Sequence, residues 1–120
     1  MKVVVSSSGQ SLDAPVDPRF GRAAFFIVVD TDTGACEAHD NAQNLNAAQG
    51  AGIQAAETVA RLGAEAVITG HCGPKAFRAL SAAGIKVVVG AEGSVNAAIE
   101  AFKSGTLAPT DAANAEGHWA

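Results

Sequence analysis

Residues 66–76 read Ala66-Val-Ile-Thr-Gly-His-Cys-Gly-Pro-Lys-Ala76, which predicts an apolar strand that passes through a short loop into a helix. The helix is expected to begin at Pro74, because proline at the first helical position lacks only an N–H that has no helical partner there. Residues 71–73, His-Cys-Gly, lie between strand and helix. Ligands of open α/β sheets bind beyond the carboxyl ends of the strands, and a helix N-terminus attracts anions. The joint therefore predicts a site for a small anionic ligand.

The hydrophobic pattern on either side of this joint predicts an α/β domain. A turn-rich stretch, Asp30-Thr-Asp-Thr-Gly34, predicts a hairpin between the second and third strands. Gly63, Gly84 and Gly105 are expected to end the three helices, since glycine takes the left-handed cap without strain. The expected strands are Lys2–Ser6, Ala24–Asp30, Gly34–Asp40, Ala66–Thr69 and Lys86–Val89, and the expected helices are about Ala47–Leu62, Pro74–Ala83 and Ser94–Ser104.

The order of these elements, β-β-β-α-β-α-β-α, is that of a ribonuclease-H-like arrangement, a mixed five-stranded sheet with helices on both faces. If strands one, four and five are parallel, the loops Ser7–Gly9, Gly70–Gly73 and Gly90–Gly93 meet at one edge of the sheet. Residues 1–107 are expected to form a single domain, and residues 108–120, which lack an apolar period, a flexible tail. The first helix is expected to face inward with Ile53, Ala56, Val59 and Ala60.

Composition limits the function classes. The 120 residues are 48% apolar, which is typical of one folded domain, and the net charge of −4 argues against a nucleic-acid partner. The N-terminal apolar run is too short for a signal peptide, and no membrane span is visible, so a cytoplasmic location is expected. Cys36 and Cys72 are then expected to be reduced thiols, and neither belongs to a zinc motif.

The long loop after the first strand contains Arg19 and Arg22, whose fixed charges and forked donors suit an anion. The alternative is that both arginines pair with nearby aspartates. His71 and Cys72 could form a nucleophile–base pair, a metal-ligand pair or neither. Adjacent residues of an extended segment point apart, which argues against a direct Cys–His dyad. Burial of Cys72 as a small apolar side chain is the competing interpretation for that residue.

Four stretches carry a family resemblance: Asp17-Pro-Arg-Phe-Gly-Arg22, Phe25-Phe-Ile-Val-Val-Asp30, the joint at 66–76, and Ala83-Gly-Ile-Lys-Val87. Together they resemble the dinitrogenase iron–molybdenum cofactor biosynthesis family, which includes the orange proteins of sulfate reducers. The resemblance runs from about Met1 to Leu107. It implies a ribonuclease-H-like fold, no catalysis, and the binding or carriage of an anionic molybdenum–copper sulfide cluster without obligatory cysteine ligation.

By position, the resemblance also implies a set of cluster-binding residues and a partner. Cys72 or His71 is the candidate for a direct bond to metal, and a protein acceptor or a P-loop ATPase is the expected protein partner. Gln49 stands where many relatives have a histidine, which makes the larger iron–molybdenum cofactor or its precursor the second choice of ligand. Two other functions compete: a regulatory module that senses a small anion, and an enzyme with Cys72 as nucleophile. The implied cluster-binding residues are Ser7, Ser8, Arg19, Phe20, Gly21, Arg22, His71, Cys72 and Gly73.

Overall fold

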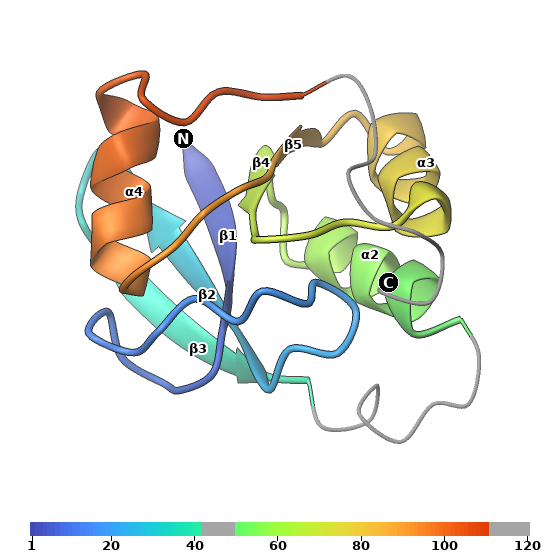
Figure 1. Ribbon diagram of the computed structural model, residues 1–120, viewed down its shortest axis with the longest axis horizontal. Helices are drawn as coiled ribbons and strands as arrows, with labels where there is room; N and C mark the ends of the chain where they lie inside the picture. Colours follow the sequence, from blue (N-terminus) through green and yellow to red (C-terminus); the bar gives the residue numbers. More distant parts are fainter. Residues whose placement is uncertain (42–49, 111–120) are drawn as a thin grey trace.

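A five-stranded mixed sheet forms the centre of the computed structural model, which describes residues 1–41 and 50–110 (Figure 1). β1 (Lys2–Ser7) lies in the middle, antiparallel to β2 (Phe25–Asp30) and parallel to β4 (Ala66–Ile68). β3 (Cys36–Asp40) pairs with β2 as a hairpin, and β5 (Lys86–Val88) pairs in parallel with β4. The order β3-β2-β1-β4-β5 confirms the predicted mixed sheet and the hairpin.

Three described helices cover the two faces of this sheet. α2 (Ala51–Arg61) and α3 (Pro74–Ala82) pack on one face, and α4 (Val95–Lys103) packs on the other, as Figure 1 shows. Side chains alternate along β1, so Val4 enters the α2 and α3 layer while Val3 and Val5 enter the α4 layer. Because β1 is covered on both sides, its strand is a continuous apolar run rather than an alternating one.

The predicted helix ends are confirmed by the backbone. Ser94 caps α4, since its Oγ accepts the N–H of Ala97 at 3.0 Å. Gly63, Gly84 and Gly105 follow the three helices with φ of 82°, 78° and 84°. The observed ends of α3 and α4 therefore lie within one residue of the ends predicted from these local residues.

The inward face of α2 differs from the prediction. Ala56 and Val59 are buried as expected, but Ile53 is 39% exposed and Ala60 is exposed as well. The buried stripe is made of small residues, which let the helix approach α3 closely, and Ile53 is not part of it. The predicted start at Ala47 lies outside the described residues, as does Gln49.

The chain beyond α4 stays attached to the sheet as far as it is described. Leu107 packs against the α4 layer, and the N–H of Thr110 donates to the carbonyl of Val87 in β5 at 2.8 Å. This contact lies just past the predicted domain end at residue 107. Residues 111–120 lie outside the described part, so the flexible tail predicted there stays a prediction. None of the described helices, of which α2 is the longest, has the length and apolarity to cross a membrane.

Candidate functional site

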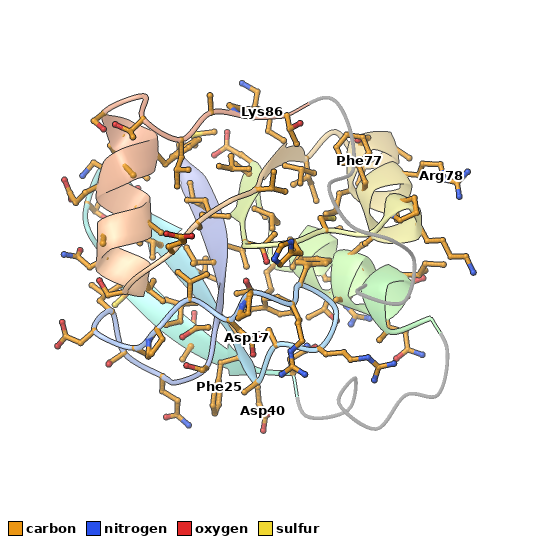
Figure 2. All side chains as sticks on the ribbon, viewed as in Figure 1. Asp17, Phe25, Asp40, Phe77, Arg78 and Lys86 are labelled. Atoms are coloured by element: carbon orange, nitrogen blue, oxygen red, sulfur yellow. The ribbon has the colours of Figure 1, made fainter. Side chains whose placement is uncertain are left out.

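Residues 8–22, which we term the strap, cross the carboxyl ends of the parallel strands (Figure 1, blue). The N–H of Asp17 donates to the carbonyl of Ser6 in β1, and the N–H of Val16 donates to that of Gly93 before α4, both at 2.9 Å. Figure 2 labels Asp17 within this loop, in front of the sheet. The three predicted loops are therefore brought together, and the strap fills the edge where they meet.

A buried polar cluster fixes the strap to the sheet. The hydroxyl of Ser6 donates to the carbonyl of Asp17 at 2.7 Å, and its oxygen lies 2.8 Å from Oγ1 of Thr69. Ser6, Asp17 and Thr69 are all buried. Sequence reasoning missed Ser6 and Thr69; the available signal was that each ends an apolar strand, and that the two strands are neighbours.

Ser6→Ala is expected to loosen the strap without unfolding the sheet. The substitution leaves the buried carbonyl of Asp17 and the hydroxyl of Thr69 short of a partner, which costs about 1–3 kcal/mol. Amide hydrogen exchange should speed up most at Val16, Asp17 and His71, whereas the amides of Val4 and Val28 in the sheet should change only as much as global stability does. Uniform acceleration across the domain would contradict a local role for Ser6.

Arg19 and His71 lie side by side at this edge. The strap forms a short parallel bridge with the loop after β4, in which the N–H of His71 donates to the carbonyl of Pro18 at 2.7 Å and the N–H of Phe20 donates to that of His71 at 3.3 Å. Bridge partners point to the same side, so Arg19 and His71 form an outward pair next to Gly73, where α3 begins. The first turn of α3 has no side-chain cap.

Phe20 and Cys72, the next residues of the two segments, point into the protein. Both side chains are fully buried in the core layer beneath α3, with Leu80. The Cys72 thiol lies 3.7 Å from the carbonyl oxygen of Gly73, and burial raises its pKa to about 12. A buried, neutral thiol cannot contact a ligand at the surface, so the position of Cys72 in the predicted cleft is corrected to the core behind it.

The remaining predicted site residues differ in exposure and in their hydrogen-bond partners. Asp17 is a structural partner for Arg19, as the alternative interpretation expected for both arginines: its carboxylate accepts the backbone N–H of Arg19 at 3.0 Å and lies 3.5 Å from the side-chain Nε, yet the Arg19 side chain stays 49% exposed. Ser7 is buried with its hydroxyl bonded to Gly9, while Ser8 is exposed on the strap. Arg22 is half-buried and Gly21 is buried.

Asn41 is a further residue of this region that the sequence did not indicate. Its buried amide donates to the carbonyl of Ala23 at 2.8 Å and to that of Gly21 at 3.4 Å. These bonds hold the turn that contains Arg22 against the end of β3. No three His, Cys, Asp or Glu side chains of the described residues lie close enough together to hold a metal ion.

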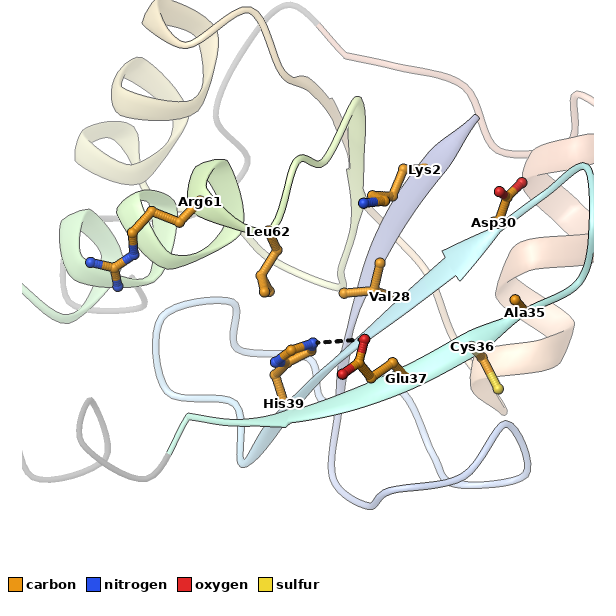
Figure 3. A pocket seen from close by; sticks show the side chains of 9 residues that line it. All are labelled: Lys2, Val28, Asp30, Ala35, Cys36, Glu37, His39, Arg61 and Leu62. Carbon is orange, nitrogen blue, oxygen red and sulfur yellow. Dashed lines mark ion pairs between the residues drawn. The ribbon is translucent and has the colours of Figure 1, made fainter.

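A cavity of about 440 Å³ lies elsewhere, between β3 and the C-terminal end of α2 (Figure 3). Its lining has two fixed cations, Lys2 and Arg61, and two carboxylates, Asp30 and Glu37. The N–H of Asp32, which donates to the Asp30 carboxylate, lowers the pKa of Asp30 and keeps it charged. The cavity therefore lacks the net positive charge that an anion requires, and the strap edge is the better candidate. Its lining residues are Lys2, Val28, Asp30, Ala35, Cys36, Glu37, His39, Arg61 and Leu62.

Comparison with known proteins places this geometry in a family. The solved apo form of the orange protein of Desulfovibrio gigas is 45% identical, with a TM-score of 0.93 over 95% of this chain and 96% of that chain. The solution structure of a putative NifB protein of Thermotoga, assigned to the DUF35 family, is 35% identical, with a TM-score of 0.82 over 97% and 98% of the two chains.

A relative in Methanocaldococcus jannaschii, an uncharacterized protein, is 30% identical over 94 residues, which are 77% of this chain and 80% of that protein. Residues 1–105 match the sequence profile described as dinitrogenase iron-molybdenum cofactor. This match spans nearly all of the described residues, the strap and the joint at 66–76 included. The chain therefore belongs to the dinitrogenase iron–molybdenum cofactor family.

Proposed function

We propose that this protein binds and carries an anionic molybdenum–copper sulfide cluster at the strap edge and catalyses no reaction on it. The observation that carries the proposal is the outward pair of Arg19 and His71 beside the uncapped start of α3. A guanidinium, an imidazole and helical N–H groups all donate hydrogen bonds, and sulfide ligands accept them. Arg22 adds a second fixed charge to the same loop.

A cluster that brings its own sulfide ligands suits this donor set better than a bare metal ion. The nearest thiol, Cys72, is buried and has a raised pKa, so the proposed contacts are hydrogen bonds and charge rather than a thiolate–metal bond. Guanidinium is more weakly hydrated than ammonium, so bringing it against a bulky, polarisable anion costs less desolvation. His71 is then the described side chain best placed for direct ligation.

The finer assignments belong to the same proposal. The alternative ligand is the iron–molybdenum cofactor or its precursor. A protein acceptor or a P-loop ATPase in the cytoplasm would receive or deliver the bound cluster. The strand order β3-β2-β1-β4-β5 supports grouping this fold with the ribonuclease-H-like arrangement. A small-anion-sensing module would use the same cations, and visible colour after loading separates it from a cluster carrier.

Arg19→Ala combined with Arg22→Ala is expected to weaken cluster binding about tenfold or more, since charge-assisted hydrogen bonds contribute about 1.5–3 kcal/mol each. The measurement is a visible absorption titration of the purified protein with tetrathiomolybdate and copper(I). The fold should be retained with a modest fall in melting temperature, because Arg22 is half-buried and Arg19 pairs with the buried carboxylate of Asp17, so their loss costs more than the about 0.5 kcal/mol typical of exposed charges.

The matched control removes two charges far from the strap, Lys86→Ala with Lys103→Ala, at the amino end of β5 and the last turn of α4. This variant should bind the cluster as the parent does. Equal cluster affinity of the arginine variant and the parent would overturn the proposed site. An equal loss of cluster affinity in both double variants would show that the overall charge of the protein, and not the site, causes the effect.

A further inference from the structure

β3 is an open edge of the sheet. Among the described residues it pairs only with β2, and Cys36, Glu37 and Ala38 are exposed along it. The opposite edge differs, because Thr110 bonds to Val87 of β5. β3 is short and carries Glu37, His39 and Asp40, and charged side chains protect an open edge, so another strand can pair here only where these side chains meet unlike partners.

The direction of the backbone groups of β3 follows from its bonds to β2. The N–H of Asp30 donates to the carbonyl of Ala35, directly opposite it, and the N–H of Asn41 donates to that of Ala24, both at 2.9 Å. Hydrogen-bonded pairs alternate along an antiparallel ladder, so residues 37 and 39 direct their backbone groups to β2. The N–H and carbonyl groups of Cys36 and Ala38 therefore point away from the sheet.

We propose that two copies of this chain associate through β3, antiparallel and about a two-fold axis at Ala38. Ala38 and the partner's Ala38 then form a hydrogen-bonded pair, each N–H donating to the other's carbonyl. The flanking non-hydrogen-bonded pairs join Glu37 to the partner's His39 and His39 to the partner's Glu37. Side chains of such pairs approach more closely than those of hydrogen-bonded pairs.

The order of side chains on β3 selects this register. Glu37 and His39 lie on the face that carries α2, where their carboxylate and imidazole are 3.6 Å apart within one chain (Figure 3). In the proposed register each carboxylate also faces an imidazole donor across the axis. A slip of two residues in one direction opposes Glu37 to Glu37, and a slip in the other opposes His39 to His39. Both alternatives set like groups against each other.

The two-fold axis would make one continuous sheet of both copies, with both α2 helices on the same face. The two cavities beside β3 would then border each other across the axis, because Glu37 and His39 line them. Isologous pairing of this kind closes on itself. The interface is small, so association is expected to be concentration-dependent rather than obligate.

Sedimentation velocity of the full chain tests the proposal at about 0.15 M salt, where charges further apart than about 8 Å are screened. The mass should rise from 12.0 kDa toward twice that value as concentration increases from about 10 µM to 1 mM. Ala38→Pro should weaken association at least tenfold yet keep the fold, since the lost N–H points outward and proline is accepted at such edge positions. A mass that stays at 12.0 kDa at all concentrations would overturn the proposal.

Charge exchange supplies a test that does not depend on proline. Glu37→Lys alone should weaken association, because the introduced ammonium group would face the partner's His39, whereas Glu37→His with His39→Glu should restore it by preserving the unlike pairs. Glu57→Lys, on the exposed face of α2, makes the same charge change away from the edge and should have no effect. If the exchanged variant is as weak as the single one, the register is wrong.

Cross-linking checks the register directly. In a Cys36→Ser background, Glu37→Cys and His39→Cys proteins are prepared separately, mixed and oxidised. Non-hydrogen-bonded partners lie about 4.5 Å apart between Cα atoms, within disulfide range, whereas like positions lie diagonally, beyond it. A disulfide-linked dimer should form only on mixing. Equal cross-linking of either protein alone would contradict the axis at Ala38.

Discussion

Gly70→Ala is expected to destabilise the domain by about 2–3 kcal/mol, because a side chain has no space between the sheet and the strap. A Cβ on residue 70 would lie 2.8 Å from Cα and 3.0 Å from the carbonyl oxygen of Pro18. Pro18 is itself held by the bond from the His71 N–H at 2.7 Å, so it cannot move alone. The strap must lift, and its bonds to neighbouring loops weaken with it. The proposed cluster should bind less tightly for the same reason.

Thermal and urea unfolding measure this effect, which corresponds to a fall of about 10 °C in melting temperature for a domain of this size. Gly34→Ala is the matched control: its φ of 78° disfavours alanine, but nothing lies within 4 Å of the added carbon. That variant should lose only about 1–2 kcal/mol, the conformational penalty itself. If the two variants are equally stable, the strap is not seated as closely on Gly70 as described.

The two cysteines are expected to differ in reactivity by a factor of about a thousand or more. At pH 8 the exposed Cys36 should react with a thiol reagent at an ordinary rate. Burial raises the Cys72 pKa from 9.0 to about 12, which alone lowers its thiolate fraction about a thousandfold, and the core blocks access as well. Because the thiolate is the reactive form, the Cys72 rate should rise with pH until near its raised pKa.

Labelling followed by mass spectrometry separates the sites. One equivalent should add rapidly to the native chain and two in denaturant, and Cys36→Ser should remove the fast addition. Cys72→Ser should retain it. Rapid modification of Cys72 in the native protein would contradict its place in the core, and would reopen both a thiol-catalysed reaction and a thiolate–metal bond at the strap edge.

Features set by local sequence were predictable. Pro74 placed the start of α3, Ser94 that of α4, and the glycines that follow the helices placed their ends, since each acts within one turn of backbone. The inward face of α2 was not, because a stripe of small residues and a single Ile53 offer competing apolar faces. Only packing in the folded domain, above all against α3, decides between them, and that packing joins residues distant in sequence.

The sequence predicted that the candidate site residues meet at one edge of the sheet, but not the directions of their side chains. Arg19, Phe20, His71 and Cys72 were all expected at one edge. Which of them reach the surface depends on the pairing of the strap with the loop after β4, a contact between segments far apart in the chain that no periodicity reports. The cavity beside β3 has no sequence signal for the same reason, since Lys2, Glu37 and Arg61 come from three separate elements.

The position of the strap has a consequence for the order of events in the cell. It lies early in the chain, but Ala14 and Val16 bond to Val95 and Gly93, which are made much later. At about 5–20 residues per second, a ribosome needs several seconds to cover that interval, during which the early loop has nothing to close upon. A cluster bound at the strap edge as proposed would be taken up only after residues 93–95 have been made, so its delivery would follow their synthesis rather than that of the strap.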